Sequence, residues 1–114
     1  MTQPRDNDSL QDILNAASLT MQFISGLDRG MFSGDLKTQA AVIRQLEIIG
    51  EAATRVSAET RKKYSDIPWP KLISMRNRLI HCYDDIELGI VWKTASVELS
   101  KLIIDVERAI ADFT

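Results

Sequence analysis

The chain has 114 residues, which suits one domain with a buried core. Hydrophobic residues make up 45% and charged residues 26%, which excludes a disordered chain, and no apolar run reaches transmembrane length. The net charge of −2 excludes a globally basic nucleic-acid binder, and one cysteine with one histidine excludes an intrachain disulfide and a zinc site. With a polar N-terminus, these features lead us to expect a cytoplasmic protein, with no membrane segment and no structural metal.

Two long amphipathic helices are predicted in the first half of the chain. The first begins near Asp8 or Ser9, where Ser9-x-x-Asp12 is a variant of the capping box, and a glycine-containing break follows it over residues 26–34. The second begins near Asp35 and ends at about Val56. Gly50 lies inside it and costs up to about 1 kcal/mol relative to alanine. A close helix–helix approach would offset that cost, and a tight dimer seam is the alternative.

The second half of the chain predicts a short element and two further helices. Residues 57–64 are predicted to form a short helix or turn. The third helix begins at the prolines around Trp69. We expect Trp69 to pack into the bundle, with stacking on a base as the alternative. Asp84 and Asp85 are the predicted N-cap of a last helix, over about residues 86–112. The expected fold is therefore all-α, an antiparallel bundle of four main helices plus a short extra helix, in a single domain over residues 1–114.

Positive charge collects just before and within the third helix. Residues 61–78 carry six lysines and arginines against one aspartate, whereas the segments on either side are acidic. This is the local charge expected of a phosphate-binding site, although a solvated basic face is the simpler interpretation. Lys71 belongs to this segment and is a candidate substrate-binding residue.

The same helix holds the only histidine of the chain. Asn77, Arg78 and His81 share a face that points away from the predicted core stripe, which is formed by Leu72, Met75, Leu79 and Cys82. Arg76 lies roughly 140° from His81 on an ideal helix, so the two side chains do not converge within one regular helix. Either the helix loosens near His81, or two copies of the motif meet across a two-fold axis. The second arrangement predicts a homodimer.

These residue types permit cleavage of a phosphodiester without a metal. A histidine with a pKa near neutrality can accept the proton of a ribose 2′-hydroxyl, and a second histidine can protonate the leaving oxygen. Arginine donates two hydrogen bonds to a phosphate as charge builds on its oxygens. On this interpretation Arg76 and His81 are the catalytic candidates, and Asn77 and Arg78 bind substrate. From the residues alone, a purely structural polar face remains the alternative.

The segment 76–83 has the pattern R-x4-H-x-Y, whose fixed positions are Arg76, His81 and Tyr83. This motif resembles the signature of HEPN-domain ribonuclease toxins, specifically the HepT-like family of MntA–HepT toxin–antitoxin systems. The resemblance extends to residues 39–53, to the lead-in from Trp69, and to the segment that begins at Val91, so that it spans most of the chain. Arg44 and Glu51 also match family-like positions, without a firm role.

The resemblance implies a HEPN-like fold and a metal-independent endoribonuclease toxin of a type VII-like pair. It implies RNA as the substrate, no cofactor, and a nucleotidyltransferase antitoxin that transfers AMP to Tyr83, where a bulky anionic adduct beside His81 would repel the substrate phosphate. Cys82 is most simply a small core residue.

Two other functions stay open. The chain could be a non-catalytic subunit that holds RNA or a nucleotide for a nucleotidyltransferase, or a helical dimer with a purely structural role. The positive charge of residues 61–78 counts against the structural dimer.

Overall fold

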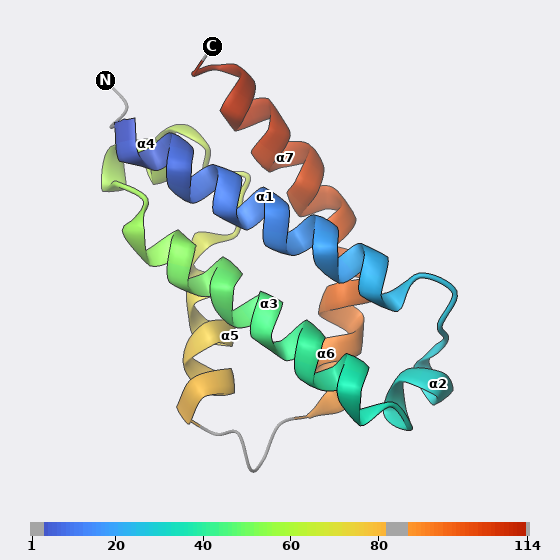
Figure 1. The fold of residues 1–114 in the computed structure, drawn as a ribbon. Coiled ribbons are helices and arrows are strands. Elements are labelled where there is room, and N and C mark those ends of the chain that lie inside the picture. The colour runs from blue at the N-terminus through green and yellow to red at the C-terminus, as the bar shows by residue number, and fades with distance from the viewer. Residues whose placement is uncertain (1–3, 82–86, 114) are drawn as a thin grey trace.

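The computed structural model describes residues 4–81 and 87–113, with the side chains of residues 5–80 and 87–113. Over these ranges the chain is helical without strands, and the order of elements is that of an antiparallel bundle, as expected (Figure 1). α1 (Pro4–Ile24) lies along α3 (Leu36–Arg55). α5 (Trp69–His81) packs behind α3, and α7 (Leu99–Ala111) packs against α1. No helix in the described ranges is long and apolar enough to cross a membrane.

The predicted start of the first helix is wrong, because α1 begins at Pro4 rather than near Ser9. A proline fits the first turn, where its missing N–H needs no partner. Ser9 is 4% exposed inside the helix and therefore cannot be its cap. The acidic residue of the first turn, Asp6, is 1% exposed and accepts hydrogen bonds from the backbone N–H of Ser57 at 2.9 Å and from its hydroxyl at 2.7 Å. Asp6 thus ties α1 to the segment that follows α3.

The expected break after the first helix contains a short helix that the sequence did not reveal. Gly26 has φ of +80°, which ends α1 because only glycine adopts this conformation without strain. α2 (Arg29–Ser33) follows, capped by Asp28, which accepts from the N–H of Met31 at 2.8 Å. Its one apolar anchor, Phe32, is fully buried and packs 5.2 Å from the ring of Trp92.

α3 confirms the predicted second helix at both ends. Asp35 accepts hydrogen bonds from the hydroxyl of Thr38 at 2.6 Å and from its N–H at 3.0 Å, and both bonds hold the pKa of the Asp35 carboxyl below its usual value. The helix ends before Val56. Arg61 then donates to the carbonyl oxygens of Val56, Ala53 and Thr54 at 3.0–3.1 Å, which satisfies acceptors that the helix end leaves open.

The predicted short element is α4 (Ala58–Lys63), with Ser57 as its N-cap. Trp69 then begins α5 and is 4% exposed. Its indole N–H donates to the carbonyl oxygens of Arg61 at 3.2 Å and Tyr64 at 3.1 Å, so the residue packs into the bundle rather than offering a base-stacking surface.

The predicted last helix is three consecutive helical segments. α6 (Leu88–Lys93) leads into a π-helical turn, η2 (Thr94–Glu98), and then into α7. The residue before α6 is Glu87, whose side chain makes no capping bond. The expected cap, Asp84 and Asp85, lies outside the described residues. On an ideal α-helix, each step of four residues turns the side chain by about 40° away from the previous one. Across the π turn, however, Val91, Ala95 and Leu99 all stay in the core, at 0–1% exposure.

Candidate functional site

Arg76 lies where α5 comes closest to α3. A Cβ atom added to Gly50 on α3 would stand 2.1 Å from the Cβ of Arg76 and 2.7 Å from the carbonyl oxygen of Leu72. Only a glycine therefore allows this approach. The close approach of two helices explains the glycine, and the alternative of a dimer seam at Gly50 is not needed.

The guanidinium of Arg76 is fixed by two neighbours. Its Nη2 lies 2.6 Å from Oε2 of Glu51, the residue after Gly50, and its Nη1 donates to Oδ1 of Asn77 at 2.9 Å. Its Nε is buried and has no hydrogen-bond partner among the described residues. Glu51 also lies 3.5 Å from Arg55, one turn further along α3. The arginine side chain is 28% exposed, so its charge is held in a defined place at the surface.

Glu51 is the site residue that sequence reasoning missed. The sequence had placed it at a family-like position without a role. Gly50 beside it carried the only available signal, because a glycine in the middle of a long helix indicates a close neighbour. Arg44, the other residue without a role, forms a 3.5 Å ion pair with Glu47 on the same helix.

The core stripe and the outward face of α5 agree with the predictions where the side chains are described. Leu79 is 3% exposed, and Leu72 and Met75 are partly buried against the core. Asn77 and Arg78 are exposed. Cys82 lies outside the described residues.

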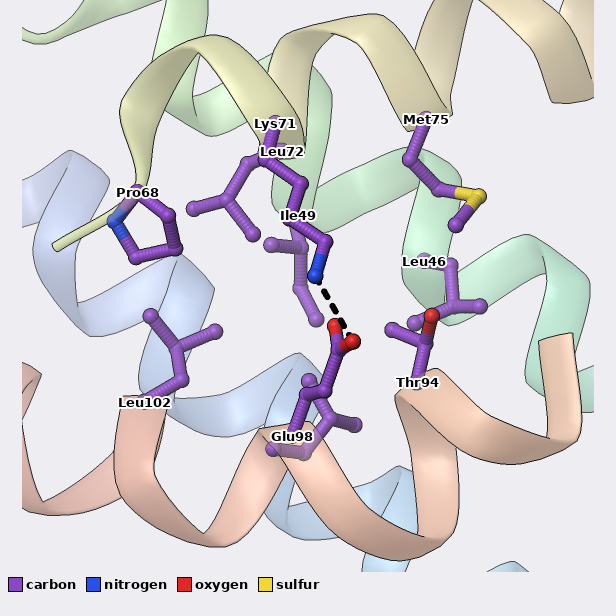
Figure 2. Close-up of a pocket in the computed structure, with 10 residues that line it drawn as sticks. Leu46, Ile49, Pro68, Lys71, Leu72, Met75, Thr94, Glu98 and Leu102 are labelled. Atoms are coloured by element: carbon purple, nitrogen blue, oxygen red, sulfur yellow. Dashed lines mark hydrogen bonds and ion pairs between the residues drawn. The ribbon is translucent and has the colours of Figure 1, made fainter. Parts of the chain in front are cut away.

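Lys71 does not join Arg76. Its ammonium group lies 2.7 Å from Oε1 of Glu98 in the π turn (Figure 2). The pair spans a largely apolar cavity of about 40 Å³ between α3, α5 and the η2–α7 segment. Figure 2 shows Lys71 reaching from α5 across this cavity, with aliphatic side chains on either side, among them Leu46, Ile49, Leu72 and Leu102. The cavity offers a small apolar space and few polar groups to a ligand.

The positive charge of residues 61–78 divides into structural and available cations. Arg61 caps the end of α3, and the ammonium of Lys63 lies 5.5 Å from the centre of the Tyr64 ring. Lys71 and Arg76 are each paired with a glutamate. Part of the basic segment therefore stabilises the fold, which a solvated basic face alone would not do.

α5 is α-helical through His81, its last residue. The backbone is therefore regular up to His81, and a loosening of the helix beyond it would fall outside the described residues. The side chain of His81, and Tyr83 entirely, lie outside the described part of the chain. Within that part, no three His, Cys, Asp or Glu side chains converge as metal ligands.

The site therefore contains a partly exposed arginine, Arg76, whose position is set by the carboxylate of Glu51 and the amide of Asn77. A second arginine, Arg78, is exposed on the same helix. Such a group can donate paired hydrogen bonds to a phosphate or carboxylate oxygen. The glutamate offsets its charge without occupying all five N–H groups.

Comparison with known proteins adds the following findings. A family model described as "Ribonuclease HepT-like" matches residues 13–109. A protein of Thermococcus cleftensis described as "Probable ribonuclease HepT" is 38% identical over 95 residues, 83% of this chain and 86% of that protein. A Methanocaldococcus jannaschii protein described as "Putative RNase" is 36% identical over 98 residues, which are 86% of this chain and 90% of that protein. A Caldanaerobacter subterraneus protein with the same description is 34% identical over 93 residues, which are 82% of this chain and 83% of that protein. No solved structure matches the chain.

Proposed function

The chain belongs to the HepT-like ribonuclease family, and from this premise we propose that it is a metal-independent endoribonuclease in which Arg76 and His81 are catalytic. The resemblance noted in the sequence, the expected all-α fold and the enzyme class, a ribonuclease, are confirmed at the level of the family. The observation that carries the proposal is the placement of Arg76, which Glu51 and Asn77 hold at the surface within the matched residues.

In the proposed reaction the imidazole of His81 accepts the proton of a ribose 2′-hydroxyl, whose oxygen attacks the adjacent phosphorus. The bond to the 5′-oxygen breaks, and a protonated histidine donates a proton to that oxygen. The products are a 2′,3′-cyclic phosphate and a free 5′-hydroxyl. Arg76 donates hydrogen bonds to the non-bridging oxygens as their charge grows, and Asn77 and Arg78 contact the substrate.

The reaction needs an acid and a base together, and we propose that two chains supply them across a two-fold axis. The continuous helix through His81 supports this, because positions five apart on an ideal helix lie roughly 140° apart, so Arg76 and His81 of one copy would not converge. The exposed side chains of Asn77 and Arg78 would then face a second copy. Analytical ultracentrifugation should give the mass of a homodimer at micromolar concentration, and a single-chain mass would contradict this proposal.

The test of activity is cleavage of single-stranded RNA in EDTA by the purified protein. We expect cleavage by the native chain and loss of cleavage in His81→Ala and Arg76→Ala, with each variant shown to be folded by circular dichroism. RNA methylated at its 2′-hydroxyls should resist. Full activity of folded His81→Ala would exclude the mechanism. Binding of RNA without cleavage by the native chain would instead identify a non-catalytic subunit.

We propose further that the chain is the toxin of a toxin–antitoxin pair, restrained by a nucleotidyltransferase that moves AMP from ATP to the hydroxyl of Tyr83 with release of pyrophosphate. The adduct would add negative charge two residues from His81, where a substrate phosphate must bind. Tyr83→Phe should stay active and escape modification. Mass spectrometry after incubation with ATP and the cognate enzyme tests the modification. An adenylyl group on another residue, or none at all, would contradict AMP transfer to Tyr83 and leave the proposed nuclease activity untouched.

A further inference from the structure

A groove that adjoins the apolar cavity runs between α5 and the α6–η2 segment. It has a volume of about 280 Å³ and is lined on one side by Lys71, Ser74 and Arg78, and on the other by Lys93, Thr94 and Glu98. Three of these side chains are cations and one is an anion.

The charges in this groove are not equally available. Glu98 is the one carboxylate among the described residues of its lining, and it lies 2.7 Å from Lys71. Arg78 and Lys93 are exposed, and within residues 5–80 and 87–113 neither has an ion-pair or hydrogen-bond partner. Among the described residues, two cations without a carboxylate partner therefore line one groove, and a third is paired with Glu98 at its edge. The groove attracts anions at Arg78 and Lys93 more than at Lys71.

The shape of the groove favours a chain of phosphates over a single nucleotide. Lys71, Ser74 and Arg78 follow one another along one face of α5, a stripe about 10 Å long at 1.5 Å per residue. Two aliphatic or thioether side chains, Met75 and Ile90, complete the lining among the described residues, and none of these lining side chains is aromatic. These side chains give a base no ring to stack on, whereas backbone phosphates need only cations and hydroxyl donors.

We infer that this groove, through Arg78 and Lys93, binds backbone phosphates of RNA that flank the cleaved bond, and that Glu98 keeps Lys71 out of that contact. The inference rests on the proposed function, because it assigns RNA as the occupant. It adds Lys93 as a substrate-binding residue that the motif does not contain. Binding here should be independent of base sequence and sensitive to salt.

The test measures the affinity of the full-length chain for a short single-stranded RNA, 2′-O-methylated so that it resists cleavage, by fluorescence anisotropy at several salt concentrations. A phosphate contact on a single strand contributes about 0.7 to the slope of log affinity against log salt, which is roughly fourfold in affinity at 0.15 M salt. Lys93→Gln should weaken binding by about that factor and lower the slope by about 0.7. Glu98→Gln should release Lys71, tighten binding and steepen the slope.

Lys37→Gln is the matched control. Lys37 is an exposed lysine in the first turn of α3 and lines none of the grooves described. This variant removes the same charge and should leave both affinity and slope close to native. Thermal unfolding of each variant verifies that the fold is intact.

The outcomes separate this inference from the proposed function. If Lys93→Gln and Lys37→Gln bind equally and the native chain cleaves unmodified RNA, the groove assignment is wrong and the nuclease stands. If Lys93→Gln alone weakens binding but the native chain cleaves nothing, the groove is an RNA site on a non-catalytic protein. If the native chain neither binds nor cleaves RNA, both proposals fail. Weaker binding by folded Glu98→Gln would also overturn the role given to Glu98.

Discussion

Glu51 on α3 holds the guanidinium of Arg76 on α5, with 2.6 Å between Oε2 and Nη2. An ionised carboxylate only accepts hydrogen bonds, so Glu51 cannot donate one to a substrate phosphate. We expect it instead to orient the guanidinium of Arg76 and to limit the directions from which an anion can approach that group.

Glu51→Gln should therefore lower kcat for RNA cleavage more than it raises KM. The amide keeps an acceptor near Arg76 but loses the charge that fixes it, and a misplacement of about 1 Å in a catalytic site can cost up to about a hundredfold in rate. Glu47→Gln is the control, because Glu47 pairs with Arg44 on the same helix at 3.5 Å. Steady-state kinetics of both variants check this, and equal kcat values would remove the positioning role.

Gly50→Ala should destabilise the fold. The new methyl group would stand 2.1 Å from the Cβ of Arg76, so α3 and α5 must separate. Overpacking of this kind costs about 1–3 kcal/mol, which outweighs the gain of up to about 1 kcal/mol in helix propensity. In Gly34→Ala the nearest atoms lie 3.9 Å away, so that variant should unfold like the native chain. Urea denaturation measures both, and a Gly50→Ala chain of native stability would contradict the packing described.

Asp6→Ala should lower the free energy of unfolding by about 2–3 kcal/mol, because it leaves the N–H of Ser57 and two hydroxyl groups without their buried acceptor. Asp12→Ala provides the comparison. Asp12 forms an exposed ion pair with Arg55 at 3.5 Å, and such pairs contribute less than about 1 kcal/mol. Similar denaturation midpoints for the two variants would show that Asp6 is not a structural anchor.

Tyr64 should titrate at unusually high pH. Burial and the 2.6 Å hydrogen bond from its hydroxyl to Asp112 raise its pKa to about 12. A raised pKa means that the stabilisation from protonated Tyr64 is complete below its unfolded pKa of about 10 and is lost as the pH rises through about 12. The advantage in stability of the native chain over Tyr64→Phe should therefore shrink across that window. Tyrosinate absorbance should show the late transition in the native chain and an earlier one in Asp112→Asn.

Helix periodicity and caps predicted most of the fold, because these signals are local. Asp35 and Ser57 cap the helices that follow them, as such residues do in isolated peptides. The start of α1 was wrong because Ser9-x-x-Asp12 has the composition of a cap but lies inside the helix. α2 was missed because five residues with one apolar anchor show no period.

The candidate site was predicted only in part, for a different physical reason. The motif placed Arg76, Asn77 and Arg78 on α5, and the period of the helix gave their directions. The partners of Arg76 and Lys71 come from other helices, and helix packing rather than local sequence brings them within reach. Gly50 indicated that a neighbour was close without indicating which one.

The π turn Thr94–Glu98 also bears on how the chain should be aligned with its relatives. An i→i+5 turn takes up one residue more than regular α-helix would, so the helical segments on its two sides keep their directions. Deletion of one residue there should restore regular winding while Lys93 kept its place in the groove and α7 kept its core face. Relatives with a shorter segment here should therefore still carry a cation at the position of Lys93, and the gap in their alignment belongs inside this turn.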